Sequence, residues 1–264
     1  MPKSWSFISN VRIQKSSPVE FDSPLIKGKL IKRYKRFLAD ITLESGEFVT
    51  AHSPNTGSMK GCSDPGSTVW LRDTRNPDRK YPLSWEMVET TSDVLVGINT
   101  LLSNSLVAEA ISNGTVAELS DYAQIKREVK YGQENSRIDL LLLDQAEQAD
   151  QADQADQKPN CYVEVKNVTL LEGTTALFPD AVTKRGSKHL RELQTMVEQG
   201  YRAVIFYCIQ RNDANEFRPA DDIDPIYGQL LRESINAGVE AIAYSAELSS
   251  MEIKLVKRVP VVCP

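Results

Sequence analysis

The 264-residue sequence lacks the features that mark membrane and secreted proteins. Its longest apolar runs are far too short to span a bilayer, and residues 1–11 contain no apolar stretch that could form the core of a signal peptide. Its four cysteines are widely spaced and form no C-x-x-C pair, which argues against disulfides and structural zinc. These absences favour a cytoplasmic protein with no membrane partner, made of one large or two small domains.

The sequence also lacks a basic net charge, since the total is −5. Residues 145–157 carry four acids and no base, repeat Gln-Ala-Asp, and contain no aromatic or β-branched residue. They are therefore predicted to form a low-complexity exposed loop. Without these four acids the net charge is −1, and residues 1–98 contain 14 Lys and Arg against 11 Asp and Glu. The overall charge thus leaves room for a local basic groove that binds nucleic acid.

Short strand-like stretches separated by turn residues predict a small N-terminal β-barrel of the OB type over residues 1–98. Within it, Tyr34 and Phe37 are interleaved with basic residues. The basic residues predicted to bind nucleic acid there are Lys32, Arg33, Lys35 and Arg36. A solvated strand face is the alternative interpretation of such a run, although interleaved aromatic residues favour nucleic acid.

Residues 51–62 form a stretch of turn-forming residues without the G-K-[ST] sequence of a phosphate-binding P-loop. Their Gly, Ser, Thr and Asn residues could offer N–H and hydroxyl donors to an anion. A structured connection is the simpler interpretation, and we adopt it.

Two hydrophobic stretches, Ser136–Leu143 and Cys161–Asn167, have the length and composition of strands. Alternation along a strand puts Glu164 and Lys166 on one face of the second stretch. In the first stretch it puts Ile138, Leu140 and Leu142 on one face and Asp139 on the other. Asp139, Glu164 and Lys166 are therefore expected to lie side by side.

Two adjacent carboxylates repel each other unless a cation lies between them, and an all-oxygen ligand set favours Mg²⁺ or Mn²⁺. An Asp, a spacer and Glu-x-Lys on a strand resemble the metal signature of the PD-(D/E)xK nuclease superfamily. That resemblance implies that Asp139 and Glu164 hold the metal and that Lys166 acts beside it in catalysis. The alternative is an ordinary Glu–Lys pair on a half-buried strand.

The order of elements over residues 99–264 supports the nuclease interpretation. Helical spacing over 99–113 is followed by three strands, a loop at 171–184, a helix at 185–199 and a hydrophobic strand at 201–209. This αβββαβ order, with a mixed sheet, is the core of that superfamily, and it gives the chain an α/β architecture (α+β overall). Glu109, at the edge of the first helix's apolar stripe, is predicted as an outer metal ligand, with Glu128 as the substitute.

The first turns of the second helix contain Arg185, Lys188, His189 and Arg191. Cations at this end of a helix oppose its dipole, so Arg185 and Lys188 are predicted to hold phosphates. Ordinary exposed charges are an equally good interpretation.

Several longer motifs resemble one family over nearly the whole chain, the sugar fermentation stimulation protein A family. These motifs are Leu30–Asp40, Pro54–Met59, Val96–Thr100, Arg127–Gly132, Tyr162–Thr169 and Phe178–Thr183. The resemblance implies an OB-like domain, a nuclease-like domain, DNA binding and a role in regulating sugar metabolism. The Gln-Ala-Asp repeat departs from the family pattern but falls between strands.

Three hypotheses follow for function. The first is a DNA-binding protein with an Mg²⁺-dependent nuclease-like site that hydrolyses phosphodiester bonds. The second is a non-catalytic DNA-binding regulator of sugar utilisation that retains the nuclease fold. The third makes the barrel a sensor of a sugar or small metabolite. Each is compatible with a monomer or a homodimer.

Overall fold

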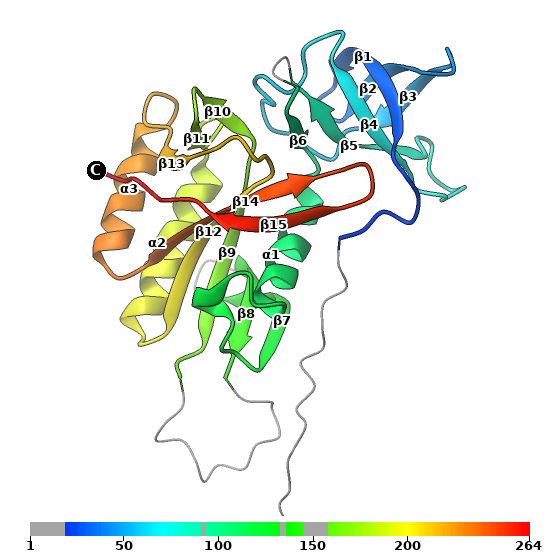
Figure 1. The fold of residues 1–264 in the computed structure, drawn as a ribbon. Helices are drawn as coiled ribbons and strands as arrows, with labels where there is room; N and C mark the ends of the chain where they lie inside the picture. Colours follow the sequence, from blue (N-terminus) through cyan, green and yellow to red (C-terminus); the bar gives the residue numbers. More distant parts are fainter. Residues whose placement is uncertain (1–18, 91–92, 133–135, 145–157) are drawn as a thin grey trace, which may run out of the picture.

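The computed structural model describes residues 19–90, 93–132, 136–144 and 158–264. An N-terminal β-barrel lies against a three-layer unit of helices and sheet (Figure 1). The low-complexity loop predicted at 145–157 lies outside the described residues.

The barrel is built from six strands in the described part of the chain. They are β1 (Ile26–Tyr34), β2 (Leu38–Leu43), β3 (Phe48–His52), β4 (Thr68–Asp73), β5 (Leu83–Glu89) and β6 (Leu95–Gly97). They pair in the order β3-β2-β1-β4-β5-β6, and a further pairing between β3 and β5 closes the sheet. Inward-facing residues such as Leu30, Ile41 and Leu71 fill the interior. The prediction of an N-terminal OB-type barrel is confirmed.

The second unit has a central sheet with helices on both faces. Its helices are α1 (Ser103–Ser112), α2 (Lys184–Glu198) and α3 (Pro225–Asn236), with short 3-10 turns η1 (Thr100–Leu102) and η2 (Ala117–Leu119). The sheet strands are β7 (Gln124–Tyr131), β8 (Ser136–Leu143), β9 (Cys161–Val168), β12 (Arg202–Ile209), β14 (Glu240–Leu248) and β15 (Ile253–Arg258).

These strands lie in the order β15-β14-β12-β9-β8-β7. The central strands β9, β12 and β14 are parallel, while β7, β8 and β15 pair antiparallel with their neighbours. Helix α1 covers one face, and α2 and α3 cover the other (Figure 1). Because β12 is buried on both faces, its sequence is almost continuously hydrophobic, as the sequence predicted. The predicted αβββαβ order and mixed sheet are confirmed.

Two elements differ from the sequence-based prediction. The stretch 171–184, expected to be a loop, contains most of β10 (Leu170–Glu172) and all of β11 (Thr175–Phe178), which form a small sheet with β13 (Glu216–Pro219). In addition, residues 19–25 lie against the connection between β14 and β15 rather than in the barrel, through backbone hydrogen bonds such as Phe21 N to Met251 O (2.8 Å). The first stretch was predicted from local pattern, and residues 19–25 were included in the barrel's range only by their position before it; neither basis shows pairing with distant strands.

Of the helices in the described residues, none is long and apolar enough to cross a membrane.

Candidate active site

The site forms where the neighbouring strands β8 and β9 separate. Backbone pairing between them covers only residues 140–142 of β8 and 161–163 of β9. One residue before the paired segment, Asp139 Oδ2 accepts a 2.8 Å hydrogen bond from the backbone N–H of Val165. The Asp139 carboxylate thus accepts a backbone N–H of β9 that no longer pairs with the backbone of β8. This bond fixes the carboxylate at the opening between the two strands.

The alternation predicted for β8 breaks at the same position. Leu140 and Leu142 belong to the cluster beneath α1, whereas Ile138 joins Leu141 in the cluster beneath α2. The prediction that Ile138 shares a face with Leu140 and Leu142 is therefore wrong. The strand changes phase at Asp139 while the β7–β8 register continues from Leu140 to Ile138, and the residue opposite Asp139, Glu128, has a left-handed φ of 54°.

Helix α1 contributes an amide to the site where the sequence predicted a carboxylate. Asn104 Nδ2 donates a 2.9 Å hydrogen bond to Asp139 Oδ1. Glu109 lies five residues later and so about 140° away around the helix, and its Oε2 accepts the backbone N–H of Val19 at 2.9 Å. The prediction of Glu109 as an outer metal ligand is therefore wrong. Glu128, its predicted substitute, borders the site, since its Oε1 lies 3.5 Å from Asn104 Nδ2.

A buried ionic cluster lies beside Asp139. The side chain of Glu164 is 3% exposed, and its Oε1 accepts a 2.7 Å hydrogen bond from Lys166 Nζ. His189 of α2 is also buried and contacts the same Oε1 through its Nδ1. The other oxygen, Glu164 Oε2, is buried without a hydrogen-bond partner. The structure therefore brings Asp139, Glu164 and Lys166 together and adds His189, which the sequence analysis had counted only among the cations of its helix.

The start of α2 orients His189. The hydroxyl of Thr183 accepts the N–H of Gly186 at 3.0 Å and caps the helix. One turn before His189, Arg185 Nε donates to His189 Nε2 at 3.3 Å. Because a guanidinium can only donate, Nε2 accepts this bond, and Nδ1 is the ring nitrogen that faces Glu164 and Lys166. The four-residue spacing of Arg185 and His189 was the sequence signal for this pair.

The environment shifts the pKa values of the two carboxylates in opposite directions. Burial and the neighbouring Glu164 raise the pKa of Asp139 to about 6, and the hydrogen bonds from Val165 and Asn104 offset only part of this. Burial also opposes ionisation of Glu164, but Lys166 and His189 outweigh it and lower the pKa of Glu164. Without a bound cation, Glu164 is therefore ionised at neutral pH. Asp139 becomes protonated when the pH falls to about 6.

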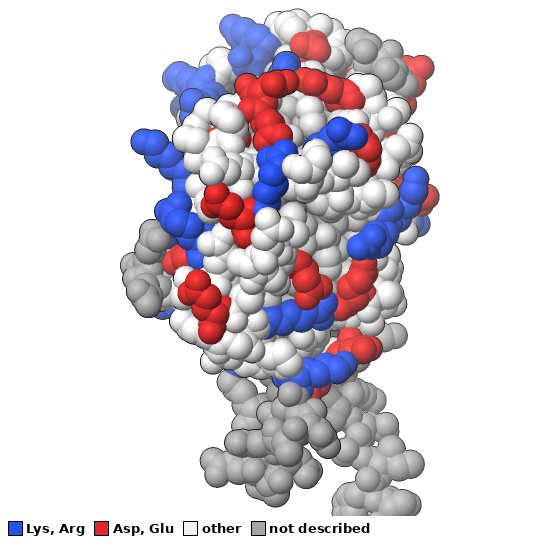
Figure 2. All heavy atoms as spheres, turned by 90° about the vertical axis from the view of Figure 1, so that its left-hand side faces the viewer, with Lys and Arg blue, Asp and Glu red and all other residues white. Residues whose placement is uncertain are grey.

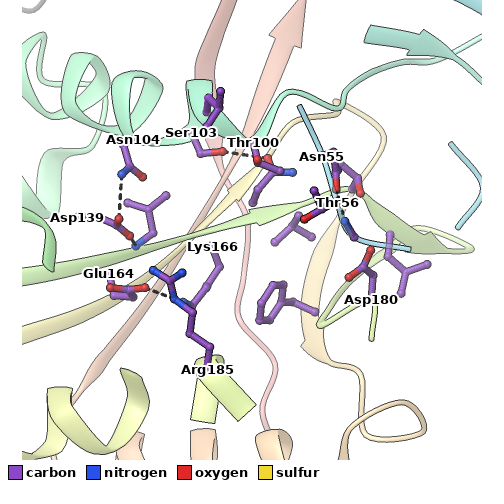
Figure 3. Close-up of a pocket in the computed structure, with 18 of the residues that line it drawn as sticks. Asn55, Thr56, Thr100, Ser103, Asn104, Asp139, Glu164, Lys166, Asp180 and Arg185 are labelled. Atoms are coloured by element: carbon purple, nitrogen blue, oxygen red, sulfur yellow. Dashed lines mark hydrogen bonds and ion pairs between the residues drawn. The ribbon is translucent and has the colours of Figure 1, made fainter. Parts of the chain in front are cut away.

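These side chains line a cavity of about 470 Å³ at the junction of the two units. Figure 3 shows Asp139, Glu164, Lys166 and Arg185 on one side and Asn55, Thr56 and Asp180 on the other. The loop between β3 and β4 therefore forms a wall of the cavity. The sequence had favoured a structured connection for this loop, and the loop is one, but it also contributes to the site.

Asp180 joins this loop to the α/β unit. Its Oδ2 accepts the N–H and the hydroxyl of Ser58, both at 2.9 Å, and the N–H of Met59 at 3.3 Å. A Cβ at Gly57 would lie 2.9 Å from the same oxygen, so a larger residue there would push the Asp180 carboxylate out of its place. The loop does present its donors to an anion, and that anion is a carboxylate of the chain itself.

The basic residues predicted to bind nucleic acid are spread over several places. Arg33 Nη2 donates to the carbonyl oxygens of Arg36, Asn55 and Gly57 at 2.7, 2.9 and 3.0 Å, so this guanidinium supports the cavity loop. Lys32 Nζ lies 3.6 Å from the Asp40 carboxylate. Such a structural role for Arg33 was not predicted.

Lys35 and Arg36 are exposed at the tip of the β1–β2 hairpin, where both have a left-handed φ, 50° and 64°. Of the six predicted residues, Arg185 lines the cavity, and Lys188 is half-buried on α2 outside it. On the side of the molecule that carries α2 and α3, basic and acidic side chains are interspersed (Figure 2).

The donor chemistry fits a divalent cation that is only partly coordinated by protein. Among the described residues, no group of three or more His, Cys, Asp and Glu side chains could hold a metal ion by itself. The site instead offers two carboxylates, one of which has a buried oxygen without a partner. Mg²⁺ usually keeps several waters and binds one or two carboxylates together with substrate phosphates. The residues present therefore fit a cation whose shell is completed by water and substrate.

A mixed sheet with an αβββαβ core, an acid where two strands separate and Glu-x-Lys on the next strand together define a restriction-endonuclease-like domain, here preceded by an OB-type barrel. Comparison with known families agrees with this class. Residues 101–252 match the family described as "Sugar fermentation stimulation protein RE domain", and residues 31–98 match the "SfsA N-terminal OB domain". The chain belongs to the sugar fermentation stimulation protein (SfsA) family.

Similar proteins extend over nearly the whole chain. The sugar fermentation stimulation protein homolog of Pelobacter propionicus is 57% identical over 239 residues, which cover 90% of this chain and 98% of that protein. The homolog of Geobacter metallireducens is 55% identical over 240 residues, 91% and 98% of the two chains. The solved structure of Pyrococcus furiosus SfsA in complex with Ca²⁺ has a TM-score of 0.79 at 26% identity and covers 93% of this chain and 99% of that chain.

The raised pKa of Asp139 predicts that neutralising this residue stabilises the protein without a cation. A folded-state pKa of about 6 lies above the usual value, so folding loses stability as the pH rises through that range. In EDTA at about pH 8, Asp139→Asn should therefore be more stable than the wild type by roughly 1–3 kcal/mol. Urea unfolding at several pH values measures the difference, which should disappear near pH 4. A variant less stable than the wild type at the higher pH would contradict this account.

The contacts of Asp180 predict that it orders the cavity loop. Asp180→Ala removes the acceptor of two backbone N–H groups, at a cost of roughly 1–3 kcal/mol in local stability. Hydrogen exchange of the Ser58 and Met59 amides should become faster, while exchange in β12 stays unchanged. Asp222→Ala, which alters an exposed acid outside the cavity, is the matched control. Unchanged exchange in the loop of Asp180→Ala would show that other contacts hold it.

Proposed function

We propose that this protein binds nucleic acid, with DNA as the expected ligand, and hydrolyses phosphodiester bonds in the presence of a divalent cation. The observation that carries the proposal is the convergence of Asp139, Glu164 and Lys166 where β8 and β9 separate. The Ca²⁺ complex of the Pyrococcus furiosus relative supports a divalent cation in this family. Mg²⁺ or Mn²⁺ is the proposed ion for this chain, because both suit oxygen ligands.

Asp139 and Glu164 are the side chains that would hold the ion, with the backbone carbonyl of Val165 as a further oxygen. When bound, a divalent cation stabilises negative charge on a phosphate and makes a coordinated water more acidic. Lys166 lies in the same cavity with its Nζ on Glu164 Oε1, where it can orient the attacking water and offset the charge that develops on the phosphate. Arg185, exposed at the cavity, can bind a phosphate oxygen.

The predicted basic residues would contact the sugar-phosphate backbone of the nucleic acid rather than its bases. Lys32, Lys35, Arg36, Arg185 and Lys188 remain the proposed contacts to the nucleic-acid backbone, whereas the Arg33 guanidinium is engaged by carbonyls of the cavity loop. Contacts of this kind set affinity and register and carry no sequence information directly. We therefore expect binding that weakens steeply with salt and depends little on sequence.

A second candidate function is a DNA-binding regulator that does not cleave. The observation in its favour is that the negative charge of Glu164 is already balanced by Lys166. The same Glu164 oxygen also contacts His189, so the three side chains need no cation to hold them together. A domain of this kind could keep its fold for binding alone and act in the regulation of sugar metabolism.

Calorimetric titration of Mg²⁺ and Mn²⁺ into the full-length protein tests the metal site. Asp139→Ala and Glu164→Ala should each weaken binding by more than about tenfold, since even indirect supports of a metal site contribute that much. Glu109→Ala is the matched control and should bind as the wild type does, because its carboxylate accepts the N–H of Val19 away from the site. Titrations of the wild type that show no binding, even with DNA present, would overturn the metal site.

Lys166 separates the two candidate functions. Lys166→Met should keep metal binding but lose roughly 10²–10⁴-fold in cleavage rate, the usual contribution of a group that moves or positions a proton. Cleavage of end-labelled single- and double-stranded DNA measures this rate. Metal binding and salt-sensitive DNA binding without any cleavage by the wild type would favour the regulator.

A further inference from the structure

The carboxylates at the reacting end of the cavity are shielded from solvent. Glu164 is almost fully buried, and Asp139 is only partly exposed. A phosphodiester can reach both carboxylates only by entering the cavity. Its volume of about 470 Å³ is in the range that proteins use for small ligands and suits one nucleotide. A stacked and paired duplex has no single nucleotide free to enter such a space.

The opposite end of the cavity has the chemistry of a base-binding pocket. Leu177 and Phe178 of β11 supply apolar surface beside Asn55 and Thr56 of the barrel loop. The Phe178 ring packs on Tyr207 and Tyr227, with centroid distances of 5.9 and 5.2 Å, so these two rings hold it in place. Aromatic rings next to amide and hydroxyl groups are the usual surroundings of an unstacked base.

Asn167 strengthens this assignment because its amide orientation is fixed. Its Oδ1 accepts hydrogen bonds from Gln210 Nε2 at 2.6 Å and from Ser103 Oγ at 3.0 Å. Gln210 is fully buried, so these partners cannot turn away. The amide NH₂ of Asn167 is then the part left to serve the cavity, as a donor for an acceptor on a base edge.

The two ends of the cavity differ in charge. Lys166 and Arg185 lie with the carboxylates at the reacting end (Figure 3), where a phosphate would bind. At the other end, the charge of Asp180 is taken up by donors of Ser58 and Met59. A nucleotide therefore fits one way, with its phosphate toward β9 and its base toward the barrel loop.

We infer that the substrate is single-stranded or locally unpaired nucleic acid, one base of which enters the barrel-side end of the cavity between residues 55–57 and Phe178. The inference rests on the proposed function and adds the substrate class. It assigns Thr56 as a residue that positions substrate and gives the barrel a direct part in the site.

The test compares a fluorescein-labelled single strand with a blunt duplex of the same sequence. Anisotropy is measured on the full-length protein in Ca²⁺, the ion of the archaeal relative's complex, and gel electrophoresis checks that the DNA stays intact. The single strand should bind at least about tenfold more tightly, in line with the contribution of one stacked base. Thr56→Trp, which fills the barrel-side end, should weaken single-strand binding by about tenfold and leave the metal titration unchanged.

Two further variants make the test specific. Thr56→Val keeps the volume but removes the hydroxyl, and should weaken single-strand binding by about threefold. Val182→Trp places the same indole at a residue that is 69% exposed and outside the cavity, and should change nothing. Equal affinity for both DNA forms, or a Thr56→Trp variant that binds as the wild type does, would overturn this inference and leave the proposed function standing. Failure to bind either form would overturn both.

Discussion

The hydrogen bond from the Val165 N–H to the Asp139 carboxylate is the contact on which the site depends. It forms because β8 and β9 stop pairing beyond Leu140, which leaves a backbone donor of β9 without a strand partner. A side-chain carboxylate that accepts a backbone N–H of the sheet is anchored to the strand that carries that N–H. Its position therefore follows from strand separation, and the neighbouring Glu164 follows from simple alternation along β9.

The barrel contributes a wall to the same cavity, and several polar contacts join it to the α/β unit. One is the group of hydrogen bonds from Ser58 and Met59 to Asp180. Another is a buried polar chain in which Asn99 Nδ2 donates to Glu86 of β5 at 2.5 Å and Gln210 Nε2 donates to the Asn99 carbonyl at 3.2 Å. Buried polar groups of this kind have strong geometric requirements. They hold the two units in one arrangement on both sides of the cavity.

Local pattern was sufficient for some features of this molecule and insufficient for others. The strands that carry Asp139, Glu164 and Lys166 were predictable because their hydrophobic composition and the Glu-x-Lys spacing are local properties, whereas the change of phase in β8 at Asp139 was not. Glu109 was misplaced because η1 precedes α1, so the helix begins at Ser103 and its register cannot be read from apolar spacing alone.

Other features depend on contacts between distant residues. Asp180 meets Ser58 across 122 positions of the chain, and no local signal records such a pairing. The same holds for Arg33. The run of basic residues around it predicted nucleic-acid binding, whereas in the structure its guanidinium donates to carbonyls of the cavity loop. Electrostatic patterns in sequence show where charge is placed and cannot show which partner it meets.

The two carboxylate oxygens of Glu164 have different surroundings, and this difference determines where a cation could bind. Oε1 carries Lys166 and His189, while the buried Oε2 carries no hydrogen bond. A cation that binds Oε2 would not have to displace Lys166, so the ammonium group could keep its place on Oε1. Such a cation would also favour the ionised form of Asp139, whose pKa burial and Glu164 raise. Two carboxylates that share one cavity repel each other, and a cation between them would relieve that repulsion.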